Sequence, residues 1–190
     1  MTMDLHASQI QGFFDIPLDH LYSSTIFSGL FSKIENDLVV VSPDVGGIKM
    51  ARSYAKRLHA ELVVIDKRRP QQNFAEIVHI IGDVKDKDVL LVDDLVDTAG
   101  TLVSAIEALK RKGARKIYGS ITHPLLSGSA IERIEKSDIH RLYISDTIPL
   151  NEEVKSDKIS VITASEIFAE AIRRTYNNES ISSLFDIDKG

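Results

Sequence analysis

The chain has 190 residues, 43% of them hydrophobic, so it can form one large α/β domain or two small ones with a proper core. Its net charge of −5 disfavours nonspecific binding to nucleic acid, and no apolar run approaches the length of a membrane span. The absence of cysteine excludes disulfides, thiolate metal sites and cysteine nucleophiles, and it fits a cytoplasmic protein.

Apolar runs and one-sided apolar spacings alternate along the chain, which predicts alternating strands and helices. The expected order is strand 38–41, helix 48–58, strands 62–65 and 89–92, helix 101–112, strand 116–122, helix 130–135, strands 142–144 and 159–162, and helix 164–176. This alternation is typical of an α/β fold with a mostly parallel, twisted sheet and helices on both faces.

Four of the predicted strands are followed by polar or glycine-containing segments. These segments are 42–47, 66–70, 93–101 and 122–124. Because ligands of such folds gather at the carboxyl ends of the strands, four loops at one edge indicate a binding site better than any one of them alone.

Asp44, Val45, Gly46 and Gly47 precede a predicted helix. Glycine lets the backbone approach a ligand closely, so the N–H groups of this loop could bind pyrophosphate while Asp44 holds Mg²⁺. An ordinary strand-to-helix turn with an aspartate cap explains the same residues equally well.

Lys67, Arg68 and Arg69 place three cations at the end of a predicted strand, ahead of a polar segment that we expect to be mobile. Such cations could stabilise the charge on a transferring phosphoryl group. A solvated basic turn is the alternative, and for these three residues in isolation it is the more common explanation.

Residues 93–101 carry the strongest signal. Asp93, Asp94 and Asp97 repel one another unless a cation or ligand hydroxyls offset their charge, and a small, hydroxyl-rich turn follows directly. A strand, a glycine-containing loop and a helix N-terminus together form a phosphate cradle, so the segment predicts a sugar-phosphate site.

Other polar positions stay open from the sequence alone. His6 follows Asp4 by two residues and is either a metal ligand, a partner of one, or a structural histidine; His123 is equally undecided. Ser145 and Thr147, at another strand end, could bind an anion or form a turn.

Taken together, the segments 4–17, 42–47, 67–70 and 93–101 resemble those of ribose-phosphate pyrophosphokinases, the phosphoribosyl pyrophosphate synthetases. Segment 93–101 is similar to a ribose-5-phosphate loop shared with type I phosphoribosyltransferases, and alone it does not separate the two families. The other three are similar to a synthetase signature, its pyrophosphate loop and its catalytic flexible loop. The resemblance covers nearly the whole chain and implies one phosphoribosyltransferase-like domain over residues 1–190.

The resemblance also implies roles for the matching residues. Lys67 is implied as the catalytic lysine at the transferring β-phosphoryl group, with Arg69 beside it and near ribose 5-phosphate. Asp93 and Asp94 are implied to contact the ribose hydroxyls or their Mg²⁺. The implied 5-phosphate loop consists of Asp97, Thr98, Ala99, Gly100 and Thr101, and the implied pyrophosphate loop of Asp44, Val45, Gly46 and Gly47.

Two further sites follow from the same resemblance. His6 and Asp44 are implied as Mg²⁺-site residues, and Ser145 and Thr147 as part of an allosteric anion site. The implied reaction is Mg²⁺-dependent transfer of pyrophosphate from ATP to the C1 hydroxyl of ribose 5-phosphate, which gives phosphoribosyl pyrophosphate and AMP for nucleotide biosynthesis. Family members are homo-oligomers, commonly hexamers, and we expect no nucleic-acid or membrane partner.

The chain departs from this family in one respect, because it resembles only the C-terminal half of a two-half architecture. The N-terminal half contributes much of the ATP site, so we expect the chain to carry the ribose-5-phosphate and pyrophosphate half-site without adenine recognition. Whether it is active alone stays open. The alternatives are a non-catalytic regulatory relative that assembles with complete subunits, and a phosphoribosyltransferase.

Overall fold

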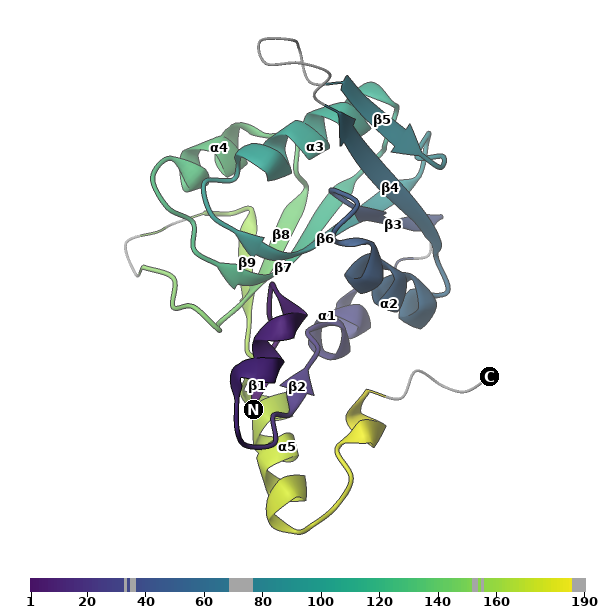
Figure 1. Cartoon of the computed structure of the whole chain (residues 1–190). Coiled ribbons are helices and arrows are strands. Elements are labelled where there is room, and N and C mark those ends of the chain that lie inside the picture. The colour runs from purple at the N-terminus through teal and green to yellow at the C-terminus, as the bar shows by residue number, and fades with distance from the viewer. Residues whose placement is uncertain (33, 35–36, 69–76, 152–153, 155, 186–190) are drawn as a thin grey trace.

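A computed structural model describes residues 1–190 except 33, 35–36, 69–76, 152–153, 155 and 186–190 (Figure 1). Its centre is a sheet with the strand order β5-β4-β3-β6-β7-β8-β9 over the described residues. The strands are β3 (Leu38–Ser42), β4 (Glu61–Arg68), β5 (Ile77–Ile81), β6 (Asp88–Val96), β7 (Ile117–Pro124), β8 (Arg141–Ser145) and β9 (Ile159–Ile162). Neighbouring strands pair in parallel except β4 and β5, which confirms the predicted mostly parallel sheet.

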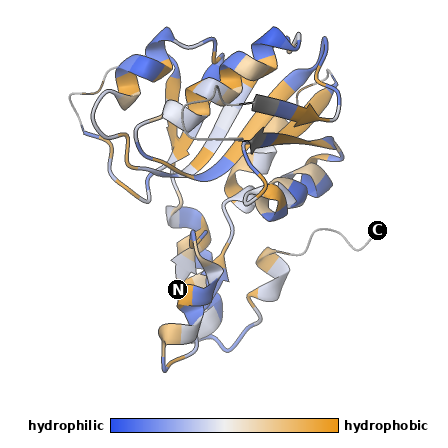
Figure 2. Ribbon diagram, turned by 45° about the horizontal axis from the view of Figure 1, so that its top comes forward, coloured by the Kyte–Doolittle hydropathy of each residue, from blue (hydrophilic) through white to orange (hydrophobic). Residues whose placement is uncertain are grey.

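Helices cover both faces of this sheet, as predicted. Helices α1 (Ser24–Phe31) and α2 (Ile48–Leu58) pack on the face that contains Val40 and Leu90. Helices α3 (Gly100–Arg111) and α4 (Ala130–Lys136) pack on the opposite face, against Val39, Val41 and Leu91. Successive strand residues alternate between the two faces because side chains in a strand have a period of two. Figure 2 shows the resulting apolar interior of the sheet between more polar outer helix faces.

A smaller group of elements lies beyond the sheet, around the N-terminus (Figure 1). It contains the parallel pair β1 (Thr2–Met3) and β2 (His20–Leu21), the 3-10 helices η1 (Ser8–Phe13) and η2 (Ser182–Leu184), and helix α5 (Ser165–Tyr176). Met3, Leu21, Ile167 and Ala171 form its apolar centre. None of the helices in the described part of the chain is long and apolar enough to cross a membrane.

Three strands continue further than the sequence predicts, so three of the expected loops begin inside strands. β4 includes Lys67, β6 includes Asp93 and Asp94, and β7 includes His123. Each extension has a partner in a neighbouring strand, since Lys67 pairs with β5 and Asp93 with β7. Polar residues continue a strand where pairing with a neighbouring strand supplies backbone hydrogen bonds. The local sequence does not show this pairing, so the predicted strands end too early.

Candidate functional site

An acidic cluster forms where β6 extends past the end of β3. β3 pairs with β6 only as far as Leu91, so Asp93 and Asp94 lie beyond that pairing. The loop that follows β3 carries Asp44, whose negative charge acts on both Asp93 and His6. The structure therefore brings together the sequence-predicted residues His6, Asp44, Asp93 and Asp94.

His6 reaches this cluster from the N-terminal segment. Its Nδ1–H donates to Asp94 Oδ2 at 2.8 Å, and its side chain is 79% exposed. This hydrogen bond and the charge of Asp94 raise the pKa of His6 above its ordinary value of 6.5. Because Nδ1 is engaged by Asp94, the second ring nitrogen is the one that can face a ligand.

Asp93 is half-buried and carries the most perturbed carboxyl group of the cluster. Burial, together with the like charges of Asp94 and Asp44, raises the pKa of Asp93 to about 7. One of its oxygens accepts the backbone N–H of Asp94 at 3.0 Å. Desolvation and like charges both disfavour the ionised form of Asp93. A bound cation or ligand hydroxyl groups would offset the repulsion among the carboxylates.

The predicted phosphate loop, residues 97–101 and called the phosphate loop below, follows β6 at the same edge. Ala99 adopts a left-handed conformation with φ of 60°, and α3 begins at the next residue, Gly100. The first N–H groups of a helix have no partner within it and lie at the positive end of the helix dipole. The predicted order of strand, loop and helix N-terminus is therefore present, with the glycine as the first residue of the helix.

The loop after β3 forms the aspartate-capped turn that was one of the two interpretations of its sequence. Asp44 Oδ1 accepts the Gly47 N–H at 2.8 Å, and the Ser42 hydroxyl donates to the Asp44 carbonyl at 2.7 Å. The turn is thus capped by its own aspartate. Glycine suits position 47, because a Cβ there would lie 2.8 Å from Ser42 Oγ and would displace the hydroxyl that bonds to the Asp44 carbonyl. Val45 and Gly46 remain exposed at the outer side of the turn.

The predicted cationic residues are only partly described. Lys67 lies in β4, in its antiparallel pairing with β5, beyond the pairing of β4 with Ser42 at the end of β3. This register places its backbone at the same sheet edge as the acidic cluster. Arg69 lies outside the described residues.

Ser145 and Thr147 lie together, but their hydroxyl groups are engaged within the protein. Ser145 is fully buried and donates to the Thr122 carbonyl at 2.5 Å, and the Thr147 hydroxyl donates to the same carbonyl at 2.7 Å. His123 Nδ1 lies 2.9 Å from Thr147 Oγ1, and its Nε2 lies 3.1 Å from the carbonyl of Met3. In this structure His123 therefore links β1 to β7.

A buried polar network under the site was not predicted from the sequence. Asp4 is 4% exposed, and its Oδ2 accepts the Ser23 N–H at 3.1 Å and the Thr122 hydroxyl at 2.7 Å. Tyr54 continues the network, with its hydroxyl 3.1 Å from Ser23 Oγ and 3.0 Å from Ser120 Oγ. The network fixes the backbone two residues before His6. Its members are single serines, a threonine and a tyrosine far apart in the chain, so no spacing in the sequence indicates it.

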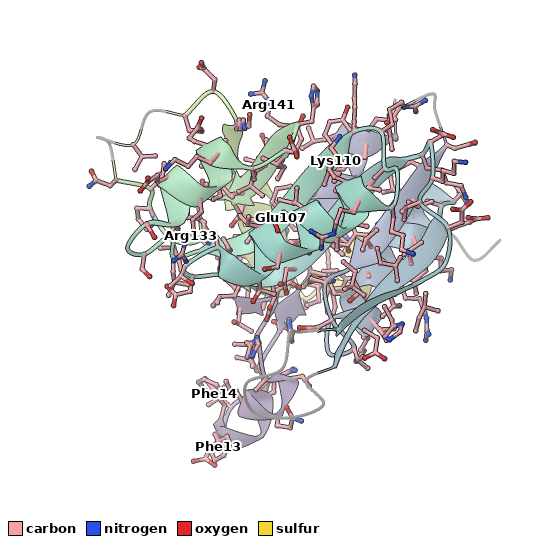
Figure 3. All side chains as sticks on the ribbon, turned by 90° about the horizontal axis from the view of Figure 1, so that it is seen from above. Phe13, Phe14, Glu107, Lys110, Arg133 and Arg141 are labelled. Atoms are coloured by element: carbon pink, nitrogen blue, oxygen red, sulfur yellow. The ribbon has the colours of Figure 1, made fainter. Side chains whose placement is uncertain are left out.

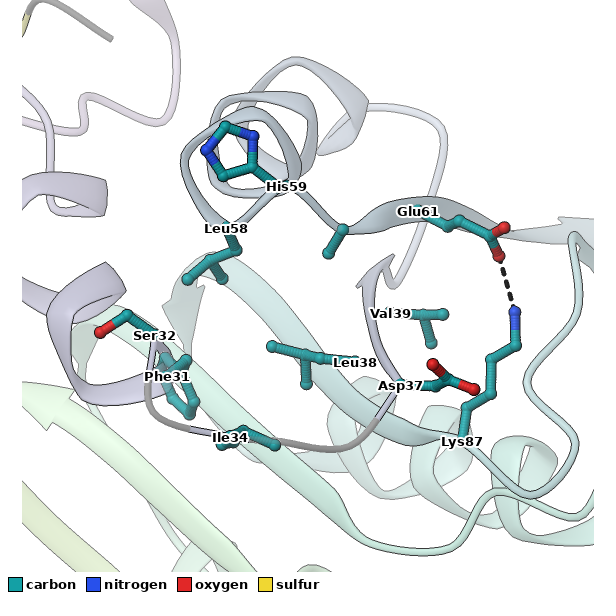
Figure 4. A pocket seen from close by; sticks show the side chains of 11 residues that line it. Phe31, Ser32, Ile34, Asp37, Leu38, Val39, Leu58, His59, Glu61 and Lys87 are labelled. Atoms are coloured by element: carbon teal, nitrogen blue, oxygen red, sulfur yellow. Dashed lines mark hydrogen bonds and ion pairs between the residues drawn. The ribbon is translucent and has the colours of Figure 1, made fainter. Parts of the chain in front are cut away.

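A cavity of about 420 Å³ lies at the opposite, amino end of the sheet (Figure 4). Phe31, Leu38 and Leu58 contribute apolar walls, and Lys87 Nζ pairs with Glu61 Oε2 at 2.7 Å on its rim. None of the predicted site residues lines it. Within the described ranges, no group of three or more histidine and acidic side chains is arranged to hold a metal ion.

Comparison with known proteins identifies a family. Residues 71–186 match the phosphoribosyl synthetase-associated domain family. The ribose-phosphate pyrophosphokinase of Chlorobaculum tepidum is 54% identical over 188 residues, which make up 98% of this chain and 58% of that protein. The ribose-phosphate pyrophosphokinase of Clostridium tetani is 50% identical over 190 residues, which are 98% of this chain and 59% of that protein. The chain therefore spans less than two thirds of the length of these curated relatives.

Solved structures show the same relationship. The crystal structure of phosphoribosylpyrophosphate synthetase from Mycobacterium smegmatis superimposes with a TM-score of 0.84 at 33% identity, over 93% of this chain and 58% of that one. The APRTase from Giardia lamblia, crystallised with 9-deazaadenine, matches with a TM-score of 0.53 at 18% identity, over 64% of this chain and 75% of that one. The second likeness concerns the fold alone.

Proposed function

Because the chain belongs to the phosphoribosyl synthetase-associated domain family, we propose that it carries the ribose-5-phosphate and pyrophosphate half of a ribose-phosphate pyrophosphokinase site. The observation that carries this proposal is the acidic cluster of Asp44, Asp93 and Asp94 beside the phosphate loop at one sheet edge. The reaction would transfer pyrophosphate from ATP to the C1 hydroxyl of ribose 5-phosphate.

Each segment at this edge of the sheet has a role in the proposed binding of the substrate. The phosphate loop binds the 5-phosphate through backbone N–H groups at the start of α3, which requires no charged side chain. Asp93 and Asp94 accept hydrogen bonds from the ribose hydroxyls, and this contact favours their ionised forms. The turn of Asp44–Gly47 lies beside them, with Val45 and Gly46 exposed toward an incoming pyrophosphate group.

The donors at this edge fit a Mg²⁺ ion that is shared with the substrate. Mg²⁺ is usually held by one or two carboxylates, with water and substrate phosphates completing its octahedron, so a cage of three protein ligands is not needed. Asp44 would bind the ion through its carboxylate. His6 would lie beside the ion, held in place by its hydrogen bond to Asp94. When bound, the ion neutralises the charge of the phosphate oxygens.

Lys67 and Arg69 would stabilise the charge on the transferring phosphoryl group. Lys67 belongs to a strand that ends at the same edge as the acidic cluster, and a fixed cation at that position contributes electrostatic stabilisation to the transition state. ATP as the second substrate and a homo-oligomeric assembly belong to the same proposal, because the family resemblance implies both.

Calorimetric titration of ribose 5-phosphate, with and without Mg²⁺ and followed by ATP, tests the proposal. We expect Mg²⁺-dependent binding that Asp94→Ala weakens by roughly 10- to 100-fold, because hydrogen bonds to charged groups contribute about 1.5–3 kcal/mol. Asp37→Ala, at the amino end of the sheet, is the matched control and should leave the affinity within about twofold, since exposed charges far from a ligand contribute little.

The titration also separates the alternatives. Full affinity after Asp94→Ala and removal of Mg²⁺ would show that the site assignment is wrong. Turnover of phosphoribosyl pyrophosphate with a nucleobase would assign the chain to the transferases instead. Binding of ribose 5-phosphate without ATP would indicate a half-site, and AMP formation by the chain alone would indicate a complete enzyme.

A further inference from the structure

We propose that Arg133 and Ser127 are positioning residues that orient the phosphate loop, with its peptide N–H groups turned toward the ligand. Both belong to a supporting segment, residues 125–133, which runs from the end of β7 into α4. The inference rests on the proposed function, because it concerns how the same loop is prepared to bind a phosphate group.

The supporting segment engages consecutive carbonyl groups at the end of β6 and in the phosphate loop. The Leu125 N–H donates to the Val96 carbonyl at 2.9 Å, and the Ser127 N–H donates to the Asp97 carbonyl at 3.0 Å. Arg133 Nη1 donates to the Thr98 carbonyl at 2.8 Å. These carbonyl groups therefore face the supporting segment.

The carbonyl directions determine the N–H directions. In a planar trans peptide, the C=O of one residue and the N–H of the next point in opposite directions, and the described chain contains no cis peptide. Holding the carbonyls of Asp97 and Thr98 against the supporting segment turns the N–H groups of Thr98 and Ala99 away from it. Among the hydrogen bonds of the described residues, neither N–H has an acceptor. Two adjacent N–H groups turned to the same side can form an anion-binding concavity.

The loop conformation requires this support. Ala99 has φ of 60°, a region that residues other than glycine enter only at a cost in free energy, and it is 3% exposed. Such a conformation persists where neighbouring contacts hold it. Besides its backbone bond, Ser127 donates its hydroxyl to Asp97 Oδ1, and Ala99 itself accepts the Val103 N–H at 3.0 Å in the first turn of α3.

Arg133 is suited to this position by its own surroundings. It lies between α4 and the beginning of α3 (Figure 3), and its guanidinium is 3.8 Å from where a Cβ on Gly100 would be. No carboxylate of the described residues forms an ion pair with it, whereas Lys136 on the same helix pairs with Glu132. Its remaining donors and its charge are thus available next to the loop.

The test compares substitutions that remove the support with matched substitutions that do not touch the loop. Arg133→Ala is matched with Lys136→Ala, which removes an equal charge from the same helix. Ser127→Ala is matched with Ser129→Ala, whose hydroxyl makes no capping bond in α4. Ribose 5-phosphate affinity is measured by calorimetry, and amide hydrogen exchange is measured at Ser127 and Val103, whose N–H groups bond to the loop.

We expect Arg133→Ala to weaken binding about 10-fold and Ser127→Ala about threefold, since each loses one hydrogen bond to the loop. Amide exchange at Val103 should accelerate in both variants, and the two control variants should change neither quantity. Ser127 carries no charge, so its effect cannot arise from direct attraction of the phosphate. It also provides a second variant if Arg133→Ala does not fold.

Three results would overturn the inference. One is wild-type affinity in both Arg133→Ala and Ser127→Ala. Another is weaker binding by Arg133→Ala with unchanged exchange and full recovery in Arg133→Lys, which would make the residue a phosphate contact rather than a positioning residue. The third is unchanged amide exchange at Val103 in both variants, which overturns the inference even if the wild-type chain does not bind ribose 5-phosphate. Failure of the wild-type chain to bind ribose 5-phosphate would refute the proposed function.

Discussion

Strand β6 begins with a buried aspartate, Asp88, and carries a half-buried one, Asp93, in its carboxyl-terminal half, and the surroundings of the two are opposite. Asp88, at the amino end, is 1% exposed and accepts the Arg115 Nε–H at 2.8 Å and the Lys116 N–H at 3.3 Å. Asp93, five residues later, is half-buried beside Asp94 and has a pKa raised to about 7. Donors of the protein offset the negative charge of Asp88, whereas a bound cation or ligand would offset that of Asp93. The same strand thus carries a structural acid and an acid of the proposed site.

A cavity lies at the amino end of the sheet, beside Leu38 and Leu58. Its rim carries the ion pair between Lys87 and Glu61, which Figure 4 shows. The proposed site instead concentrates like charges, those of Asp44, Asp93 and Asp94. The proposal therefore rests on uncompensated charge at the carboxyl ends of the strands and not on concavity.

Asp88→Ala should give the largest effect, a destabilisation of about 2–4 kcal/mol, because the buried carboxylate accepts hydrogen bonds from Arg115 and from the Lys116 N–H, and hydrogen bonds to charged groups contribute about 1.5–3 kcal/mol each. Chemical denaturation at neutral pH measures it. The exposed Asp138→Ala serves as the control, with an expected change within about 0.5 kcal/mol. A cost for Asp88→Ala no larger than that of the control would remove the contrast between the two ends of β6.

Asp93→Asn should act in the opposite direction and stabilise the unliganded chain at pH 8 by about 1–3 kcal/mol, since one pKa unit corresponds to about 1.36 kcal/mol. The folded state raises the pKa of Asp93 from 3.8 to about 7. The contribution of this group to stability is therefore fully present below pH 3.8 and is lost as the pH rises through about 7. Asparagine does not ionise, so the variant does not lose this stability as the pH rises.

The pH profile of unfolding distinguishes this cause from a packing effect. The difference between Asp93→Asn and the wild type should be close to zero near pH 4 and should grow toward pH 8. A constant gain across that range would indicate better packing. The same variant should bind ribose 5-phosphate less well, because the amide replaces an acceptor of the ribose hydroxyls with a group that also donates.

The sequence predicts most of the sheet and its flanking helices because apolar periodicity is a local property. The residues of 48–58 form α2 and those of 159–162 form β9 as predicted, and the other predicted helices differ by one residue at most. Asp93, Asp94 and residues 97–101 are likewise contiguous in the chain, so their residue types and spacing predict this part of the proposed site directly.

Features that depend on distant partners were missed. The strand positions of Lys67, Asp93 and His123 depend on neighbouring ladders, and the burial of Asp4 depends on Ser23 and Thr122. Helix α1 was missed because it is short and contains Gly29, which lowers helix propensity. The support of the phosphate loop by residues 125–133 belongs to the same class, since a guanidinium bound to a carbonyl 35 residues away has no sequence signature.

The smallest expected effect concerns the amino end again, at His59 on the cavity rim. This residue follows the last turn of α2 with φ of 50°, the left-handed position that glycine occupies in many helix C-termini. His59→Gly should stabilise the chain by about 0.5–1 kcal/mol, since relief of the left-handed strain exceeds the added entropy of the unfolded state. Ribose 5-phosphate affinity should stay unchanged, because the cavity has no part in the proposed site. If His59→Gly weakened that affinity, the two ends of the sheet would be coupled, and the separation of a structural end from a functional one would fail.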